Sequence, residues 1–187
     1  MGTRFHITGA SGSGVTTLGR ALAQALSCPS FDTDDFFWLP TDPPYAEKRP
    51  VTRRLALMNE LFLRRPGWVL SGSLNGWGDP LIPFFDAVVF VTLPPEERLR
   101  RLAAREVRRY GTAALQPGGR EHVGHKAFMA WAERYDDPTF TGRSRARHEA
   151  WLSALPCPVI EVSSDRPVEE MVHDVTSALT PRERISA

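Results

Sequence analysis

The glycine-rich segment at residues 9–17 is the feature that most constrains this chain, because it lies between a strand pattern at residues 5–8 and a helix pattern at residues 18–26. In that context successive backbone N–H groups point into one concavity, and the amino terminus of the helix adds positive partial charge. Such a turn holds a polyphosphate through the main chain alone. A turn of small residues that binds nothing is the alternative. The candidate nucleotide-binding residues are Gly9, Gly12, Ser13, Gly14, Val15, Thr16 and Thr17.

Two positions near the end of this segment decide what it can do. Thr16 can supply the hydroxyl group that ligates Mg²⁺. Val15 stands where a complete phosphate-binding motif carries the lysine that reaches the β- and γ-phosphates. The sequence therefore predicts a nucleoside triphosphate, expected to be ATP, with Mg²⁺ as the cofactor, and it requires another cation if phosphate is transferred.

Composition limits the class of protein. The chain has 187 residues, of which 42% are hydrophobic and 24% are charged, which suits one α/β domain and is short for two. A formal net charge of +1 offers no clustered basic surface, so neither nucleic acid nor an anionic membrane is an expected partner. Cys28 and Cys157 are isolated and are expected to be buried thiols in a reducing cytosol, so we expect a cytoplasmic protein.

The order of the patterns predicts the fold. Apolar strand patterns at residues 5–8, 68–70, 87–91 and 158–162, and a short one before Asp32, alternate with helical patterns. This alternation predicts an α/β fold with a parallel, doubly wound sheet of about five strands. The unbroken apolar run at residues 87–91 is expected at the centre of the sheet. Residues 36–50, which are rich in proline and aromatics, are expected to form an ordered loop.

Two further patterns supply charged side chains. Asp32 and Asp34 alternate along a segment expected to be extended, so both carboxylates should point toward the glycine-rich turn, where one can act as a general base. A helix cap or turn around Asp35 is the alternative. Arg101 and Arg105 are four residues apart on the helix expected after Pro94, so they share one face. The alternative is that this face is exposed to solvent and binds nothing.

Over nearly its whole length the chain resembles the small P-loop kinases of the adenylate kinase and shikimate kinase type. The resemblance rests on residues 9–17, on the acidic cluster at residues 32–35 and on the helix pattern at residues 93–105. It implies a three-layer P-loop NTPase fold in a single domain at residues 1–187. It also implies a helical acceptor-binding insert near residues 34–66 and a lid near residues 106–147. Residues 34–44 and 71–80 resemble, more narrowly, a bacterial adenylate kinase-like P-loop ATPase group in which the loop lysine is replaced.

The resemblance also implies roles for individual residues. Asp32 would help to hold Mg²⁺ through water, and Asp34 would orient a hydroxyl group of the acceptor. Arg101 and Arg105 would contact nucleotide phosphates. Arg143 and Arg147 are the candidate lid arginines that would close over the transferred group. Any of Arg101, Arg105, Arg143 or Arg147 would then take the place of the missing lysine.

The acceptor side is expected in the loops after the second and third strands, at the carboxyl edge of the sheet. Trp38, Tyr45, Asn75 and Trp77 are the candidate acceptor-binding residues, although loop aromatics also serve to pack an insert against a core. By the resemblance, Asn75 replaces an arginine that grips the acceptor's monophosphate in adenylate kinases, which argues against AMP. His122, His125 and His148 are expected on helix surfaces, since their spacing does not supply a zinc site.

Three functions are consistent with these residues. A kinase would transfer the γ-phosphoryl group of ATP to a small-molecule acceptor, whereas a simple NTPase would use water as the acceptor. A catalytically silent nucleotide-binding module that acts as a switch is the third function, and Val15 favours it. Thr16, Asp32, Asp34 and the lid arginines favour an enzyme.

Overall fold

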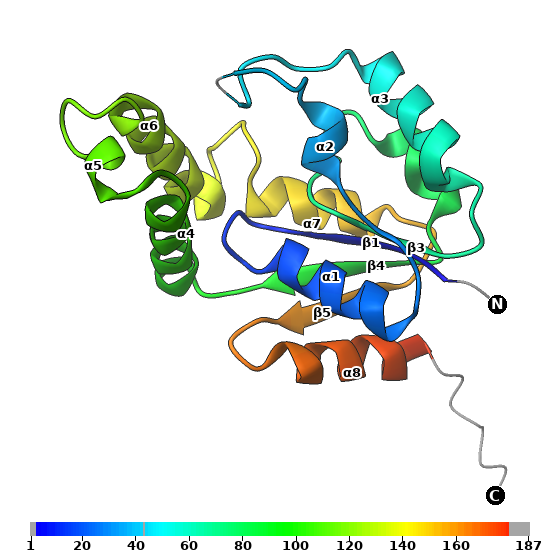
Figure 1. The fold of residues 1–187 in the computed structure, drawn as a ribbon. Helices are drawn as coiled ribbons and strands as arrows, with labels where there is room; N and C mark the ends of the chain where they lie inside the picture. The colour runs from blue at the N-terminus through cyan, green and yellow to red at the C-terminus, as the bar shows by residue number, and fades with distance from the viewer. Residues whose placement is uncertain (1–2, 43, 180–187) are drawn as a thin grey trace, which may run out of the picture.

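The computed structural model of the protein describes residues 3–42 and 44–179, so both ends of the predicted domain and Pro43 lie outside the described residues. A parallel sheet with the order β2-β3-β1-β4-β5 forms the middle layer (Figure 1). The strands are β1 (Arg4–Gly9), β2 (Ser30–Asp32), β3 (Trp68–Ser71), β4 (Ala87–Thr92) and β5 (Val159–Ser163). The predicted α/β fold with a five-stranded, doubly wound parallel sheet is confirmed.

The prediction that residues 87–91 form the central strand is wrong, because β1 is central and β4 lies beside it. β1 contains His6 and Thr8, which make its sequence look less apolar than that of β4, yet both are fully buried. His6 shares a hydrogen bond of 3.0 Å between its Nδ1 and the carbonyl oxygen of Leu70, so burial of its ring leaves that nitrogen satisfied. An unbroken apolar run therefore identified an interior strand but not the centre.

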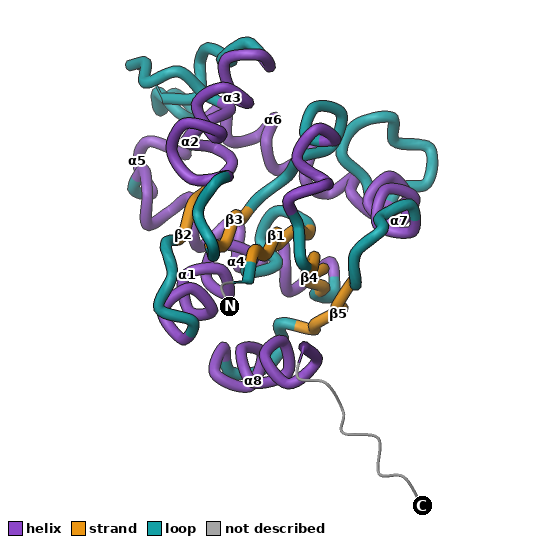
Figure 2. Tube along the Cα trace, turned by 90° about the vertical axis from the view of Figure 1, so that its right-hand side faces the viewer, coloured by secondary structure: helices purple, strands orange, loops and turns teal. Residues whose placement is uncertain are grey.

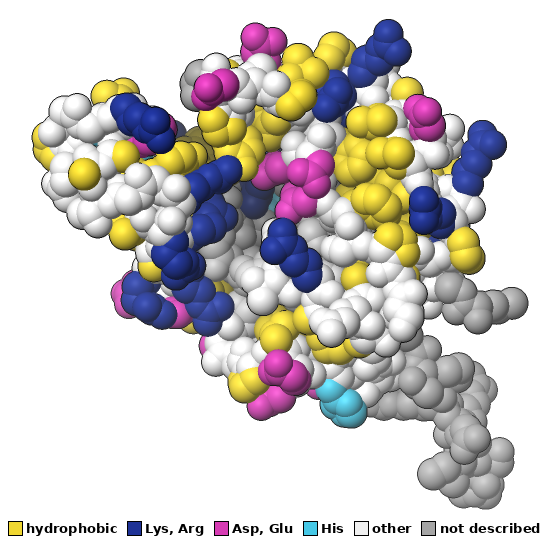
Figure 3. Space-filling view, viewed as in Figure 1, with side chains coloured by type: hydrophobic (Ala, Val, Ile, Leu, Met, Phe, Trp, Pro, Cys, Tyr) yellow, Lys and Arg dark blue, Asp and Glu magenta, His cyan; other side chains and the backbone are white. Residues whose placement is uncertain are grey.

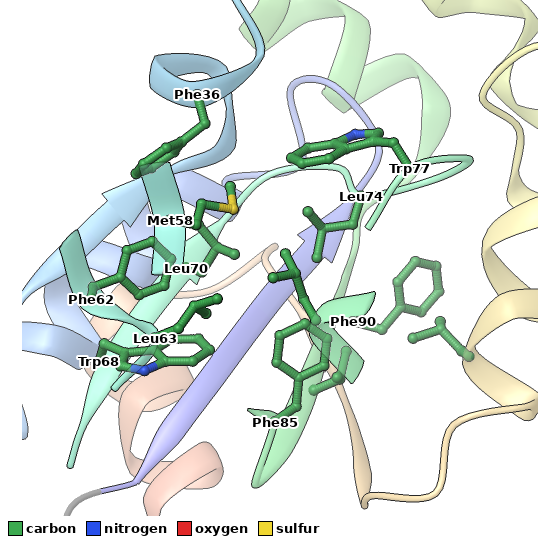
Figure 4. Packing of buried hydrophobic residues seen from close by; sticks show 13 residues of the cluster. Phe36, Met58, Phe62, Leu63, Trp68, Leu70, Leu74, Trp77, Phe85 and Phe90 are labelled. Carbon is green, nitrogen blue, oxygen red and sulfur yellow. The ribbon is translucent and has the colours of Figure 1, made fainter. Parts of the chain in front are cut away.

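Helices cover both faces of the sheet, as the view along the strands shows (Figure 2). One face carries α1 (Val15–Ala25) and α8 (Val168–Leu179), whose apolar sides join Phe5, Ile7 and Val89 in one core cluster. The other face carries α3 (Val51–Met58), the π-helical turn η1 (Asn59–Leu63), the 3₁₀ turn η2 (Asp79–Phe84) and α7 (Arg145–Ser153). Their buried side chains form a second, aromatic-rich cluster (Figure 4).

A separate group of helices extends from the carboxyl edge of the sheet (Figure 1). It consists of α4 (Pro95–Tyr110), α5 (Thr112–Leu115), α6 (His122–Glu133) and the 3₁₀ turn η3 (Arg134–Asp136). The helix expected after Pro94 is confirmed as α4. Within the described ranges, none of the helices has the length and apolar character that spanning a membrane requires.

A short helix, α2 (Thr33–Phe37), begins where the sequence predicted an extended segment and a loop. The cause is Asp32, which has extended backbone angles and accepts a hydrogen bond of 3.0 Å from the backbone N–H of Asp34. The alternative interpretation of the acidic cluster as a helix cap is therefore correct, and the extended geometry expected for Asp34 is wrong.

Candidate functional site

A cleft of about 1430 Å³ opens at the carboxyl ends of the strands, between the sheet and the helices α4 and α6. Figure 3 shows this hollow with Lys and Arg side chains over α4 on one side and Asp and Glu side chains near α2 on the other. Nearly all residues predicted from the sequence line it: Gly9, Gly12, Gly14, Val15, Thr16, Thr17, Asp32, Asp34, Trp38, Asn75, Trp77, Arg101, Arg105, Arg143 and Arg147.

The glycine-rich turn requires its glycines. Gly12 and Gly14 have φ angles of 85° and 93°, in the left-handed region that other residues rarely adopt. A Cβ atom on Gly12 would lie 2.4 Å from the carbonyl oxygen of Arg98, and a Cβ on Gly9 would lie 2.4 Å from that of Val91. The turn is therefore packed against β4 and α4, with the amino terminus of α1 directly behind it.

Ser13 is the predicted nucleotide-binding residue that does not line the cleft. Its side chain is fully buried, and its hydroxyl donates a hydrogen bond of 2.9 Å to the carbonyl oxygen of Ala10. The hydroxyl of Ser164, in the turn after β5, donates to the carbonyl oxygen of Ser13 at 2.6 Å. The backbone N–H of Ser13 also donates to the carbonyl oxygen of Ala10, at 3.2 Å, so Ser13 shapes the turn through both its side chain and its main chain.

Asp32 connects the turn to the helix on the acceptor side. Its Oδ2 accepts a hydrogen bond of 3.1 Å from the hydroxyl of Thr16, while its Oδ1 caps α2 through the N–H of Asp34. A hydroxyl and a carboxylate at this spacing are hard oxygen ligands of the kind that Mg²⁺ prefers. The residues present at this position therefore fit a magnesium ion.

The carboxylate of Asp34 lies at the cleft, and its pKa is raised above the ordinary value for an aspartate. Desolvation in the cleft raises its pKa, and the neighbouring charges of Asp32 and Asp35 add to that effect. The guanidinium groups of Arg143 and Arg105 act in the opposite direction, which indicates that both cations lie near this carboxylate. Asp34 is thus a partly desolvated base beside arginines, an arrangement that is common at catalytic sites.

Arg143 is the arginine that reaches the glycine-rich turn. Its Nη2 donates hydrogen bonds of 2.9 Å to the carbonyl oxygen of Gly9 and 3.3 Å to the hydroxyl of Ser11. Its Nε is buried and has no hydrogen-bond partner among residues 3–42 and 44–179. Desolvation lowers the pKa of Arg143, but an arginine remains charged at neutral pH. A cation therefore lies at the turn, with one donor still free for a ligand.

Buried contacts hold the segment that carries Arg143. Asp136 accepts hydrogen bonds from Arg98 of α4 at 2.9 Å and from Arg145 of α7 at 2.7 Å. Arg98 is only 1% exposed, and it also donates to the carbonyl oxygen of Ala132 at 3.0 Å. Because Arg98 also contacts Gly12, these ion pairs join the glycine-rich turn, the helical extension and α7. The position of Arg143 is thus fixed from both sides.

The other predicted arginines have different roles in the cleft. Arg101 donates to Glu97 at 2.9 Å and to the carbonyl oxygen of Ser164 at 3.0 Å, so it fastens the turn after β5. Arg105 makes a long contact of 3.4 Å with Glu106 and stays half exposed to the cleft. Arg147 donates to the carbonyl oxygen of Thr141 at 2.6 Å. Neither Arg101 nor Arg147 makes the contact with the turn that Arg143 makes.

The helix-surface position expected for His148 is wrong, because this side chain is fully buried. The hydroxyl of Tyr135 lies 2.7 Å from His148 Nδ1, and desolvation lowers the pKa of His148 to about 3. His122 lies 2.9 Å, through Nδ1, from the carbonyl oxygen of Leu115, and His125 lines the cleft. In the described part of the chain, no group of three or more His, Cys, Asp or Glu side chains is arranged to hold a metal ion.

Sequence reasoning missed Asp136, Ser164 and Arg54 as residues that position this site. Asp136 and Ser164 act on segments far away in the chain, so their role has no local pattern. Arg54 is 5% exposed, and its guanidinium lies 3.8 Å from the centroid of the Phe37 ring. Arg54 precedes the fully buried Met58 by four residues, so helical spacing places it on the apolar face of α3, and an arginine on that face is a signal that could have identified it.

A family model described as "AAA domain" matches residues 6–118. The uncharacterized protein YqaC of Bacillus subtilis (strain 168) is 41% identical over 180 residues, which cover 96% of this chain and 99% of YqaC. The relative thus extends over the helices α6 to α8 as well as over the region that the family model matches.

Solved structures share the fold at low sequence identity. A gluconokinase from Sinorhizobium meliloti 1021 is 18% identical with a TM-score of 0.53, covering 94% of this chain and 90% of its own. A shikimate kinase from Bacteroides thetaiotaomicron is 16% identical with a TM-score of 0.56, covering 95% and 98%. A shikimate kinase from Acinetobacter baumannii, solved in complex with shikimate, is 18% identical with a TM-score of 0.52, covering 95% and 93%.

Proposed function

Because the chain belongs to the AAA domain family and has the fold of solved small-molecule kinases, we propose that it transfers the γ-phosphoryl group of ATP to a hydroxyl group of a small acceptor. The glycine-rich turn would hold the phosphates through its backbone N–H groups. The helix amino terminus of α1 would add favourable charge.

The observation that carries this proposal is the position of Arg143 at the turn. Phosphoryl transfer needs positive charge at the oxygens of the γ-phosphoryl group more than it needs covalent chemistry. The electrostatic field of a guanidinium at the phosphoryl group depends on its distance from that group and on its orientation. It does not depend on which segment of the chain carries the arginine. Arg143 would therefore replace the lysine that Val15 displaces, and Arg105 would add charge when the lid closes.

Asp34 would orient the acceptor and receive its proton. The hydroxyl oxygen of the acceptor attacks the γ-phosphorus, the bond from that phosphorus to the β,γ-bridging oxygen breaks, and the hydroxyl proton passes to Asp34. Thr16 and Asp32 would hold Mg²⁺, which supplies charge neutralisation at the phosphate oxygens when it is bound. The carboxylate beside the arginines supports an acceptor other than water.

We further propose the division of labour within this one domain. Residues 34–66, which contain most of α2 together with α3 and η1, would bind the acceptor. Residues 106–147, which contain the end of α4, α5, α6, η3 and the segment with Arg143, would form the lid. Movement of the lid over the cleft would exclude water from the transferred group.

One assay tests the proposal. The purified protein is incubated with Mg-ATP, alone and with nucleosides, nucleoside monophosphates, sugars or hydroxy acids, and ADP is measured together with the phosphorylated product. ADP release that requires an acceptor is the expected result. ADP release without an acceptor would identify a simple NTPase, and nucleotide binding without ADP would identify the silent module.

The variant Val15→Lys tests whether Arg143 replaces the loop lysine. Val15 packs against the core cluster of α1 and α8, and its Cγ2 lies 3.1 Å from the position that a Cβ of Gly9 would take. A lysine here would compete with Arg143 for the same phosphates, so we expect no gain in turnover. A large gain would contradict the proposed role of Arg143, because it would mean that the native turn lacks a working cation.

A further inference from the structure

Aromatic rings form a continuous wall on the acceptor side of the cleft. Phe37 contacts Trp38 at 4.8 Å and Trp77 at 6.1 Å between ring centroids, and Trp38 contacts Tyr45 at 5.8 Å, each pair edge to face. These side chains, called here the aromatic wall, all line the same cleft as the glycine-rich turn. Trp77 also belongs to the buried cluster on that face of the sheet, where it lies beside Leu74 (Figure 4).

The aromatic wall is held rigidly from behind. The guanidinium of Arg54 lies 3.8 Å from the centroid of Phe37 and 5.0 Å from that of Trp77, and among the described residues it forms no ion pair with a carboxylate. Arg49 donates hydrogen bonds of 3.0 Å and 3.2 Å to the carbonyl oxygens of Phe36 and Trp38. A buried cation and these backbone contacts fix the rings before a ligand arrives, which lowers the entropic cost of binding.

Tyr45 closes the outer end of the wall. Its backbone is in the left-handed region with a φ angle of 64°, and its hydroxyl accepts a hydrogen bond from Arg109 of α4. The same guanidinium lies 4.5 Å from the centroid of the Tyr45 ring. Such backbone strain persists only where surrounding contacts hold it. Arg109 is therefore held against Tyr45 at the outer end of the wall.

Two polar groups beside the wall remain available. The carboxylate of Asp34 faces the cleft, and it can accept a hydrogen bond from a hydroxyl group. The Nδ2 of Asn75 is buried, lies in a residue that lines the cleft, and has no hydrogen-bond partner in the described part of the chain. A buried donor without a partner costs free energy, so a ligand oxygen at this position would be favoured.

The charge on this side disfavours an anionic acceptor. Asp32, Asp34 and Asp35 are close enough that the first and last raise the pKa of Asp34. A phosphate or carboxylate placed against them would be repelled, while the guanidinium groups of Arg54 and Arg109 and the ammonium of Lys48 each lie over an aromatic ring. Among the cations that line the cleft, Arg143 and Arg105 are the two that lower the pKa of Asp34, and the proposed transfer requires both of them.

From this arrangement we infer that the acceptor is a neutral alcohol that carries a planar heteroaromatic ring, as nucleosides and pyridine alcohols do. The inference rests on the proposed kinase function. The ring would stack on the aromatic wall, a hydrogen-bond acceptor on the ring, either nitrogen or oxygen, would accept from Asn75 Nδ2, and the hydroxyl group would face Asp34. Stacking on aromatic faces raises the affinity for a flat ring, whereas an open-chain sugar acid has no ring that could stack.

Calorimetry tests the inference without requiring turnover. The protein, with Mg²⁺ and a nonhydrolysable ATP analogue, is titrated with uridine, adenosine and pyridoxine, and separately with ribose, gluconate and uridine monophosphate. At least one ring alcohol should bind about tenfold more tightly than ribose, since stacking on an aromatic side chain has about that effect on affinity. Uridine should also bind more tightly than its monophosphate.

Substitutions in the aromatic wall test whether the ring alcohol binds there. Trp38→Leu should weaken the ring alcohol about tenfold and leave the affinity for the ATP analogue unchanged. Trp151→Phe is the matched control, because Trp151 donates to Asp79 at 3.0 Å outside the residues that line the cleft. Tyr45→Leu provides a second variant of the wall if Trp38→Leu is poorly folded.

Each result decides the inference. If none of the ring alcohols binds at about 10 mM, which is above the usual range of KM, the inference is wrong. It is also wrong if the monophosphate binds more tightly than uridine, or if ribose or gluconate is phosphorylated in preference. Those outcomes leave the proposed kinase intact, whereas failure of the ATP analogue to bind would overturn the proposed function itself.

Discussion

The guanidinium of Arg143 donates a hydrogen bond of 2.9 Å to the carbonyl oxygen of Gly9, although the two residues lie 134 positions apart in the chain. Gly9 opens the glycine-rich turn, and Arg143 lies between η3 and α7. A positive charge therefore reaches the proposed phosphate site from the far end of the lid segment. In the proposed function, Arg143 supplies the positive charge that a lysine at position 15 would otherwise bring to the phosphates.

Arg143→Ala is expected to lower kcat by roughly 10³-fold or more, the range found when a transition-state arginine is removed. The affinity for ATP should fall much less, because the backbone N–H groups of the turn remain. Steady-state kinetics and calorimetry with an ATP analogue measure the two effects. Arg134→Ala is the control: Arg134 contacts Asp137 at 3.2 Å and does not line the cleft, so its removal should leave both values unchanged.

Asp34→Asn is expected to lower kcat by roughly 10²- to 10⁴-fold and to raise the Tm at neutral pH. Because desolvation raises the pKa of Asp34, the folded state binds this proton more tightly than the unfolded state. The stability that Asp34 contributes is therefore lost as the pH rises from its ordinary value through the raised pKa. A neutral asparagine avoids this loss, so the variant should be less active and more stable.

Asp137→Asn is the control with the opposite sign. Hydrogen bonds from Thr139 and Arg134 lower the pKa of Asp137, so its stabilising effect is present at neutral pH and is lost on acidification. Thermal unfolding near pH 7 should therefore show a lower Tm for this variant, with activity unchanged. A lower Tm for Asp34→Asn would show that the ionised carboxylate stabilises the fold. That result would contradict the prediction, because a raised pKa means that ionisation of Asp34 destabilises the folded state.

Gly12→Ala and Gly76→Ala separate backbone strain from crowding. Both glycines have left-handed φ angles, 85° and 80°. A Cβ on Gly12 would meet the Arg98 carbonyl oxygen at 2.4 Å, whereas a Cβ on Gly76 would have no atom within 4 Å. Chemical denaturation should show a loss of about 1 kcal/mol for Gly76→Ala and a clearly larger loss for Gly12→Ala. Equal losses would mean that the contact with Arg98 adds nothing.

The sequence predicted the parts of this molecule that short-range patterns determine. The turn at residues 9–17 and the alternation of strands with helices are local, so they could be read from spacing. Asp32 also carries a local signal, that of a helix cap, and it turned out to serve both α2 and Thr16. The position of β4 beside the central strand is decided by which neighbours pair with it, and no pattern within β4 contains that information.

The choice among the arginines lay beyond the sequence for the same reason. Four of them were candidates to replace the lysine, and Arg143 reaches the turn because Asp136 binds both Arg98 and Arg145. That ion-pair arrangement joins three separate segments. The buried position of His148 was likewise missed, since α7 has no strong apolar face and its burial depends on Tyr135 and on the sheet.

The free energy of unfolding is expected to fall on mild acidification because of His148 and His6. Desolvation lowers the pKa of His148 to about 3 and that of His6 to about 4, from an ordinary value of 6.5. Below pH 6.5 these histidines are protonated in the unfolded state but stay neutral in the folded state. The free energy of unfolding therefore decreases as the pH falls from 6.5 toward the folded-state pKa values. At about pH 5 the loss should be roughly 2 kcal/mol for each histidine.

Denaturant unfolding measured from pH 7 to 5 checks this expectation. His148→Gln should reduce the dependence of the unfolding free energy on pH, whatever its effect on stability at pH 7, because glutamine does not titrate. His173→Gln, at an exposed position of α8, is the matched control and should leave that dependence unchanged. If His148→Gln and the native protein lose stability in parallel, then His148 is protonated in the folded state at pH 5, and desolvation does not hold it neutral.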